Sequence, residues 1–436
     1  MPLQGTGVGF AGGHERLTTG GKRILVHDFA GHPFQVDLSR HLAGRGHDVL
    51  HVHCASYTSG KGRVDDEIDI TDNGHGTARR GRLRVVGLES GREFARYSPA
   101  RRVTQEVAYG RRFTRLAAGF RPDVVISCNV PLFAHAVAAR WCRKHDIPWV
   151  FWLQDLYSVA AGTEAANRAG AVGRSLARGL EGIERRLLRQ AAHVVPITAD
   201  FQAQLDSWGI GADRCTVVEN WAPLDDLPPQ PRANAWRDEH QLGDGFVFLY
   251  SGTLGLKHRP ELLYELARHV DDAEVVVVSQ GRGEARLRAL LVERPLPNLR
   301  LLPFQPFDRY PEVLGAADVV VTLLEPTAGT YSVPSKVLSY LCAGRPILGA
   351  IPHENLAART IRGADAGLVV DPTDEEAFLV AAKRLRNEAQ LRSNCGRSAR
   401  SYAEATFDSD SITDRFVEII DGVLGPRPPA LLRALA

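Results

Sequence analysis

The chain has 436 residues, of which 44% are hydrophobic and 24% are charged, and its net charge is +2. This length exceeds that of most single domains and predicts two domains of about 200 residues each. The small net charge gives no reason to expect a nucleic-acid partner. No stretch reaches the roughly 18 uninterrupted apolar residues of a membrane span. Residues 1–21 are polar and Gly-rich, which predicts a disordered leader rather than a signal peptide.

Six cysteines are scattered along the chain, mostly inside apolar runs and without CxxC spacing. Structural zinc ligands usually come in closely spaced pairs, and structural disulfides belong to oxidising compartments. We therefore expect buried, reduced thiols in a cytoplasmic protein and no zinc site.

The first half opens with a strand, helix and strand. Residues 22–27 and 48–53 are apolar runs of strand length, and the segment between them has a helical apolar face that ends at Gly46. This opening is typical of a doubly wound parallel sheet in an α/β fold. The first turn lacks a GxGxxG and the second strand ends without a carboxylate, which disfavours a nicotinamide-dinucleotide site.

Residues 79–121 are rich in arginine, with twelve arginines against three glutamates. One interpretation is a basic surface that rests on anionic lipid. The other is a solvated helix face in an arginine-rich protein. The apolar residues interleaved with the arginines are Phe94, Tyr97, Tyr109, Phe113 and Leu116.

The strand at 148–153 delivers Gln154 and Asp155 at its carboxyl end. In open parallel sheets ligands lie at that end, so Asp155 is a site candidate, with an N-cap as its alternative role. Residues 157–172 are rich in Ala and Gly and are expected to form a mobile loop before a helix over 174–192. The Pro-rich tract within 223–245 predicts a linker between domains.

The second half restarts the strand–helix rhythm. An apolar strand at 246–250 precedes a loop with Gly252, Gly255 and Lys257. Glycines let the backbone approach a ligand and present N–H groups, and the lysine adds a positive charge. A second Gly-rich strand end lies at 281–283. Together these loops suggest a diphosphate, as in a nucleotide.

A further anion site is predicted after the apolar strand at 318–324. Ser332 is expected to cap a helix over 333–343, with Lys336 near its first turn. The free N–H groups and the dipole at such a helix start attract anions. The same pattern also suits an ordinary crossover without a ligand.

The alternative to a site built from these loops is a DxD-like metal-binding motif. Asp408 and Asp410 match a DxD pattern, but they precede a helix, where capping is the favoured role. We therefore predict no catalytic metal. Two helices, at 375–390 and 410–424, are expected to close the chain before a flexible tail at 425–436.

The motifs YSGTLGLKHRPELL, VSQGRGEARL and SVPSKVLSYLCAGRPIL, in two successive Rossmann-like halves, resemble the GT-B glycosyltransferases of the retaining GT4 (group 1) family. Within it, the chain is most similar to the branch that makes bacterial surface polysaccharides of the colanic acid and O-antigen type. The resemblance implies two facing Rossmann-like domains with a cleft between them. It implies an acceptor-side domain at 22–222, a nucleotide-sugar-binding domain at 246–408 and a C-terminal helix at 409–424.

The resemblance also implies a mechanism: retaining, metal-independent transfer from a UDP- or GDP-linked sugar, without a cofactor. It assigns Asp155, Lys257 and Lys336 to the catalytic machinery, with the lysines on the diphosphate. The remaining implied donor contacts are Gly31, Gly252, Thr253, Gly255, Gly281, Gln305, Ser332, Val333, Ser335 and Ser339.

This sequence departs from the family's pattern at three positions. Two glutamates of the family fall at Tyr331 and Ser339, so Ser339 is left to make one hydrogen bond to the ribose. Glu325 is a possible stand-in for the first glutamate. Thr253 replaces a frequent arginine.

The implied acceptor is a saccharide or a lipid-linked saccharide, which would suit a peripheral protein at the inner membrane face touching anionic lipid through 79–121. Two alternatives stay open: a sugar-nucleotide 2-epimerase of the same fold, and an inactive nucleotide-sugar-binding protein.

Overall fold

The structure is a computed structural model of the whole chain. It describes residues 21–57, 61–64, 68–70, 81–90, 99–255, 257–329 and 332–425. The leader predicted over residues 1–20 and the tail predicted over 426–436 lie outside the described residues, as do Phe94, Tyr97 and Tyr331.

The N-terminal domain contains a seven-stranded sheet in the order β3-β4-β2-β1-β5-β6-β7. Neighbouring strands are parallel except for β3, which runs antiparallel to β4. The central strands are buried along nearly their whole length, which explains their continuous apolar sequences. The strands are β1 (Arg23–Asp28), β2 (Asp48–Cys54), β3 (Ile68–Ile70), β4 (Gly81–Leu88), β5 (Val124–Cys128), β6 (Trp149–Leu153) and β7 (His193–Pro196).

Among the described residues, four helices connect strands of this sheet, because parallel strands need crossover connections. They are α1 (Pro33–Gly44), α2 (Pro99–Phe120), α3 (Leu132–Lys144) and α4 (Tyr157–Gln190), and α5 (Gln202–Ser207) follows β7.

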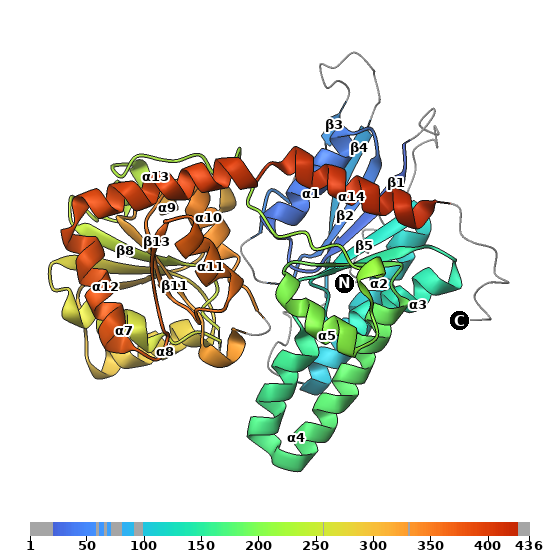
Figure 1. The fold of residues 1–436 in the computed structure, drawn as a ribbon, viewed down its shortest axis with the longest axis horizontal. Helices are drawn as coiled ribbons and strands as arrows, with labels where there is room; N and C mark the ends of the chain where they lie inside the picture. The colour runs from blue at the N-terminus through green and yellow to red at the C-terminus, as the bar shows by residue number, and fades with distance from the viewer. Residues whose placement is uncertain are drawn as a thin grey trace, which may run out of the picture.

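The C-terminal domain contains a separate six-stranded sheet, all parallel, in the order β10-β9-β8-β11-β12-β13. Its strands are β8 (Phe246–Ser251), β9 (Ala273–Val278), β10 (Leu299–Leu302), β11 (Val319–Leu323), β12 (Ile347–Ala350) and β13 (Gly367–Val370). The helices that follow the N-terminal domain are α6 (Ala235–Glu239), α7 (Glu261–His269), α8 (Arg282–Glu293), α9 (Tyr310–Gly315), α10 (Lys336–Cys342), α11 (Leu356–Gly363), α12 (Glu375–Asn387), α13 (Ala389–Thr406) and α14 (Ser409–Leu424). Two facing Rossmann-like domains were predicted, and the two sheets confirm them (Figure 1).

The mobile loop predicted over 157–172 is wrong, because α4 begins at Tyr157. Helix α4 is folded back on itself at Gly170, whose φ of +52° is left-handed. Glu184 accepts hydrogen bonds from the backbone N–H groups of Tyr157 and Ser158, at 3.0 and 2.8 Å, which a straight helix of this length could not allow. Figure 1 shows α4 as a two-legged hairpin projecting from the N-terminal domain. The Ala- and Gly-rich composition of residues 157–172 therefore does not indicate a loop. Its small side chains let the two legs of the hairpin pack closely.

In its described residues, 81–90 and 99–121, the arginine-rich region forms strand β4 and helix α2. Tyr109 and Phe113 are buried, and both stack on the ring of His27, at centroid distances of 5.8 and 3.8 Å. The prediction of an aromatic-bearing basic surface is therefore wrong for these two residues, since α2 turns them into the core. Exposed arginines remain on its other face.

The last helix returns to the N-terminal domain. Phe416 of α14 packs 4.7 Å from the ring of Trp152 in β6, and Asp414 pairs with Arg45 of α1 at 2.7 Å. Asp408 accepts a hydrogen bond from the N–H of residue 410 and caps α14, which confirms the capping role predicted there. The chain thus passes between the domains twice (Figure 1).

Five of the six cysteines are buried and Cys215 is half-buried, and all six are free thiols, as expected. In the described part of the chain, no helix combines the length and the apolar character that a membrane crossing needs.

The N-terminal domain buries His135 against aromatic side chains. His135 lies between Trp149 and Phe151, and its Nε2 has no partner among the described residues. Burial lowers the pKa of His135 from 6.5 to about 3. Below pH 6.5, therefore, His135 is protonated in the unfolded chain but stays neutral in the folded chain. The free energy of unfolding falls as the pH falls for this reason.

The His135→Phe variant should not show this loss of unfolding free energy at low pH. Between pH 7.5 and pH 5 the wild type should lose up to about 2 kcal/mol more unfolding free energy than the variant, at about 1.4 kcal/mol per pH unit below 6.5. Urea unfolding at the two pH values measures the difference, with His145→Phe at an exposed position as control. Equal losses in wild type and variant would contradict the account.

Candidate functional site

A cavity of about 990 Å³ lies between the two domains. Residues that follow β1, β5 and β6 line it from the N-terminal domain, and residues that follow β8 and β11 line it from the C-terminal domain. It therefore sits at the carboxyl ends of both sheets, where parallel α/β folds bind ligands. Its size is in the range of small-molecule sites, at the upper end.

The loop after β8 packs closely against Lys336. Gly252 has a φ of +131°, and a Cβ there would lie 3.1 Å from Cε of Lys336. A glycine is needed because only it tolerates both that conformation and that approach. The backbone N–H groups expected to face an anion are largely used within the protein: Gly252 donates to Val278 and Gly255 donates to the His258 ring, at 3.0 and 2.9 Å. Side chains, rather than this loop's amides, supply the positive charge.

Two lysines converge on this wall of the cavity. Lys257 donates a hydrogen bond to the hydroxyl of Ser332, which joins the loop after β8 to the loop after β11. The ammonium of Lys336 lies 3.6 Å from the ring centroid of Tyr250 and contacts the Tyr250 hydroxyl. Neither lysine has an ion-pair partner among the described residues. The arrangement therefore favours an anionic ligand.

Burial and mutual repulsion act on these cations. Burial and the charge of Lys257 hold the pKa of Lys336 well below its ordinary value. His258 responds in the same way, since burial and the charges of Lys336 and Lys257 hold its pKa well below 6.5. An anion placed between the lysines would relieve this repulsion, because opposite charge favours the protonated form.

The expected helix over 333–343 is shorter than predicted. Helix α10 begins at Lys336, and Ser332 does not cap it: its backbone N–H donates to Ala328, and its hydroxyl accepts from Lys257. Pro334 lies in the extended segment before the helix, which delays the start. Ser332, Val333 and Ser335 still line the cavity, so the loop approaches the ligand as a segment rather than as a long helix end.

The C-terminal wall also carries uncharged hydroxyl and amide groups. Ser339 stands at the cavity where the resemblance expects a glutamate, and Thr253 and Gln305 also line it. Gln305 is fixed by hydrogen bonds with Trp236, at 3.3 Å, and with the Pro303 carbonyl, at 3.0 Å. These side chains can therefore make hydrogen bonds, without carrying a charge, to a polar ligand.

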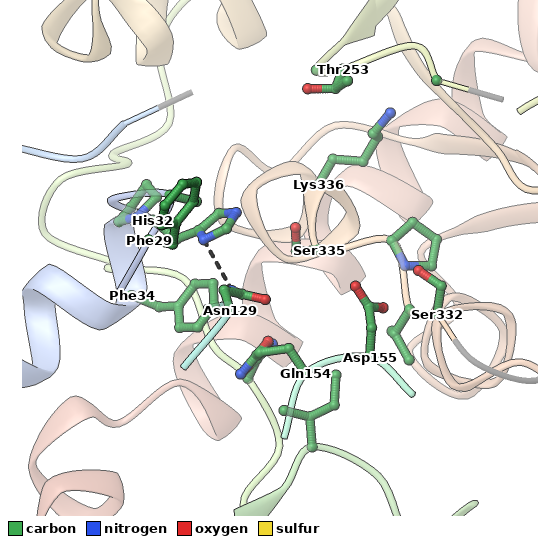
Figure 2. Close-up of a pocket in the computed structure, with 18 of the residues that line it drawn as sticks. Phe29, His32, Phe34, Asn129, Gln154, Asp155, Thr253, Ser332, Ser335 and Lys336 are labelled. Atoms are coloured by element: carbon green, nitrogen blue, oxygen red, sulfur yellow. Dashed lines mark hydrogen bonds between the residues drawn. The ribbon is translucent and has the colours of Figure 1, made fainter. Parts of the chain in front are cut away.

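Asp155 is exposed to the cavity at the end of β6, on the N-terminal side (Figure 2). The N-cap of α4 is Leu156, so the alternative role of Asp155 as a helix cap is wrong. Glu184 satisfies the first N–H groups of α4 instead. Asp155 thus presents a carboxylate to a ligand, across the cavity from the lysines.

Two predicted contact residues, Gly31 and Gly281, do not line the cavity. Gly31 has a φ of +75° and packs against Lys61 and Val64, so it shapes the turn after β1. Gly281, with a φ of +123°, packs behind the loop of Gly252: a Cβ there would lie 2.9 Å from the Leu254 carbonyl oxygen. Glu325, the proposed stand-in for a glutamate, is also not part of the lining.

Sequence reasoning missed the polar group of the N-terminal wall. His32 and Asn129 line the cavity, and Nδ2 of Asn129 lies 3.2 Å from Nδ1 of His32 (Figure 2). Asn129 directly follows β5 and His32 lies in the turn between β1 and α1, so the sequence signal was their place after central strands. Tyr250, which supports Lys336, is hidden inside an apolar strand and gave no signal.

Two family models match adjacent parts of the chain. The model described as "Glycosyl transferase 4-like domain" matches residues 31–221, and the one described as "Glycosyl transferases group 1" matches residues 233–402. Together they span most of the chain, including both walls of the cavity. The chain belongs to the group 1 glycosyltransferases. It is therefore a glycosyltransferase enzyme with the GT-B fold.

Individual relatives agree with this family. The glycosyltransferase is 26% identical over 309 residues to a protein of Escherichia coli K12 named as the colanic acid biosynthesis glycosyl transferase WcaI, covering 70% of this chain and 75% of that protein. Its fold matches sucrose-phosphate synthase of Thermosynechococcus elongatus with a TM-score of 0.69 at 15% identity, covering 92% and 99% of the two chains. It matches Anabaena HepE, solved in complex with UDP-glucose, with a TM-score of 0.65 at 15% identity, covering 92% and 100%.

The lysine geometry of this glycosyltransferase predicts proton uptake on ligand binding. Lys336 has a lowered pKa in the free protein, and a bound diphosphate would raise that pKa. At pH values between the pKa of the free protein and the pKa of the complex, binding should therefore be accompanied by uptake of a proton. Affinity for UDP or GDP should accordingly fall as the pH rises through that window. Titration calorimetry in two buffers of different ionisation enthalpy measures the uptake.

Lys336→Arg should bind without this uptake, since arginine stays protonated. The exposed Lys383→Arg is the matched control and should behave as the wild type. Identical proton uptake in wild type and Lys336→Arg would show that another group titrates.

Proposed function

We propose that the protein is a retaining, metal-independent glycosyltransferase. It moves a sugar from a UDP- or GDP-linked donor to a saccharide or lipid-linked saccharide during the synthesis of a surface polysaccharide. The observation that carries this proposal is the pair Lys257 and Lys336, which line the same wall of the cavity without a carboxylate partner among the described residues.

The pair suits the charge that develops during transfer. When the bond between the sugar's anomeric carbon and the diphosphate breaks, the electron pair leaves with the diphosphate. Lys257 and Lys336 would stabilise that charge from a preorganised position, so the proposed reaction does not require a metal ion or another cofactor. Asp155, on the facing wall, would stabilise the positive charge that develops on the sugar ring.

The donor and the biological role are supported by similarity. HepE, of the same fold, was solved with UDP-glucose, which supports a nucleotide-sugar donor. WcaI is named for colanic acid biosynthesis, which supports a role in polysaccharide synthesis. The hydroxyl and amide groups around Ser339 and Gln305 would hold the nucleoside in place of the family's glutamate.

The transfer reaction gives a direct test. Lys257→Ala should fold as the wild type but lose about 10²–10³-fold in kcat, because one group that stabilises the leaving charge is gone. A screen of nucleotide-sugars with a saccharide acceptor, read out as release of free nucleotide, first identifies the donor. Thermal unfolding checks the fold, and Lys383→Ala is the control.

Turnover of Lys257→Ala at the wild-type rate would remove this lysine from the mechanism. Donor that comes back isomerised, without free nucleotide, would indicate an epimerase, and binding without turnover of any donor would indicate an inactive protein.

We also propose that the protein is cytoplasmic and that helix α2 contacts anionic lipid at the inner membrane face. At 3.6 residues per turn, the exposed Arg101, Arg111 and Arg115 lie within about a quarter of the helix circumference. A surface arginine contributes about 1 kcal/mol toward binding an anionic membrane, so three together suffice for measurable association.

Replacing these three arginines with glutamine should weaken binding to vesicles containing anionic lipid by at least about tenfold, and binding to neutral vesicles should stay low. Vesicle sedimentation measures this. The triple replacement of the exposed Arg286, Arg288 and Arg397 in the C-terminal domain is the charge-matched control. Unchanged association of the α2 variant would overturn the proposal.

A further inference from the structure

The turn after β1 holds a buried carboxylate that organises the N-terminal wall of the cavity. Asp28 is fully buried. Its two carboxylate oxygens accept the backbone N–H groups of Ala30, at 3.0 Å, and His32, at 2.6 Å. A buried carboxylate is costly unless such donors satisfy it. The contacts therefore fix the turn that carries His32 to the cavity.

Gln35, one turn along α1, completes this arrangement. Its carboxamide nitrogen belongs next to Asp28, because the opposite orientation would bring two oxygens into contact. In that orientation the nitrogen lies 2.6 and 2.7 Å from the Asp28 oxygens and 3.3 Å from Nδ1 of His32. Nδ1 of His32 thus faces an amide N–H donor.

Asn129 presents a second amide to the same ring atom. It follows β5, which pairs with β1 so that Cys128 lies beside Asp28. Asn129 has a left-handed φ of +51°, a strained conformation that asparagine tolerates better than most residues. This conformation places its Nδ2 3.2 Å from Nδ1 of His32.

These contacts decide where His32 carries its proton. Nδ1 of His32 lies 3.2 and 3.3 Å from the two amide nitrogens, whereas Oδ1 of Asp28, at 3.7 Å, is beyond hydrogen-bonding distance. Nδ1 therefore accepts, and in the neutral ring the proton sits on Nε2. Figure 2 shows the His32 ring at the cavity, with Asn129 on one side and with Lys336 across the open space. Nε2–H is therefore a hydrogen-bond donor to a ligand between the two domains.

We propose that His32 is a catalytic residue whose Nε2–H donates a hydrogen bond to the donor's diphosphate from the N-terminal domain. This rests on the function proposed above. Lys257 and Lys336 hold the diphosphate from one side, and His32 would complete its coordination from the other when the domains close.

The chemical step leaves the histidine unchanged. The bond from the anomeric carbon to the diphosphate oxygen breaks, and its electron pair stays on that oxygen. The acceptor's hydroxyl oxygen bonds to the anomeric carbon, and its proton passes to the departing phosphate. His32 keeps its proton and stabilises the charge on the leaving group.

The electrostatics agree with a donor role. Burial lowers the pKa of His32, but the negative charge of Asp28, whose Oδ1 lies 3.7 Å from Nδ1, outweighs it, so that the net shift is upward. The added proton then goes to Nδ1, beside that carboxylate. Protonation of the ring would leave Nε2–H in place. The group therefore stays a donor in both charge states.

Two near-isosteric variants test the proposal, because a Gln side chain places its amide nitrogen near Nε2 of histidine and an Asn side chain places its own near Nδ1. His32→Gln should bind UDP or GDP and transfer sugar within about tenfold of the wild type. His32→Asn should weaken nucleoside diphosphate binding by about tenfold or more and kcat/KM by about 10²-fold. The exposed His145→Asn is the control.

Calorimetry with UDP and GDP and the transfer assay together separate the outcomes. If His32→Gln is as inactive as His32→Asn while the wild type transfers, the ring must accept a proton, and the donor role is overturned. Wild-type behaviour of His32→Asn would also overturn it. Failure of the wild type to bind or transfer would instead overturn the proposed function.

Asn129 acts as a positioning residue in this account. Asn129→Gly keeps the left-handed backbone and removes the amide that aims the ring. It should reduce kcat by about tenfold with little change in donor KM or in thermal stability. A loss confined to stability would show that Asn129 is only structural.

Discussion

Two lysine side chains that line the same wall of the cavity, without a carboxylate to balance them in the described part of the chain, are the constraint on which this structure depends. Lys257 reaches Ser332, and Lys336 lies over Tyr250 and against Gly252. Folding brings these charges together at an energetic cost, which appears as the lowered pKa of Lys336. An enzyme that binds a diphosphate recovers this cost in the complex, where the repulsion becomes attraction.

The rest of the fold serves to place a second wall opposite these lysines. The C-terminal sheet ends at the lysine loops, and the N-terminal sheet ends at Asp28, Asn129 and Asp155. Helix α14 returns to the N-terminal domain and packs on Trp152, so the two domains are joined by two chain crossings. In the proposed reaction the lysines would hold the leaving group from one wall, and the other wall would contribute His32 to the diphosphate and Asp155 to the sugar. This arrangement also explains why neither domain alone would form the site.

The sequence alone predicted the two sheets, most of their strands and the meeting of the two lysine loops, because strand composition and glycine spacing are local signals. It did not predict β3 and β4, which lie in polar and arginine-rich sequence. It failed where tertiary contacts decide. The hairpin of α4 depends on Glu184 capping a helix start 26 residues earlier. The role of Ser332 depends on Lys257, 75 residues away. His32 is an ordinary turn residue in the sequence and becomes a site residue only through Asp28 and Asn129.

A crystal structure with UDP or GDP bound is the most direct test of the central claim. The account predicts that the diphosphate lies within hydrogen-bonding distance, about 2.7–3.2 Å, of Nζ of both Lys257 and Lys336. A nucleotide bound elsewhere, or a diphosphate that leaves Lys336 in contact only with Tyr250, would contradict it.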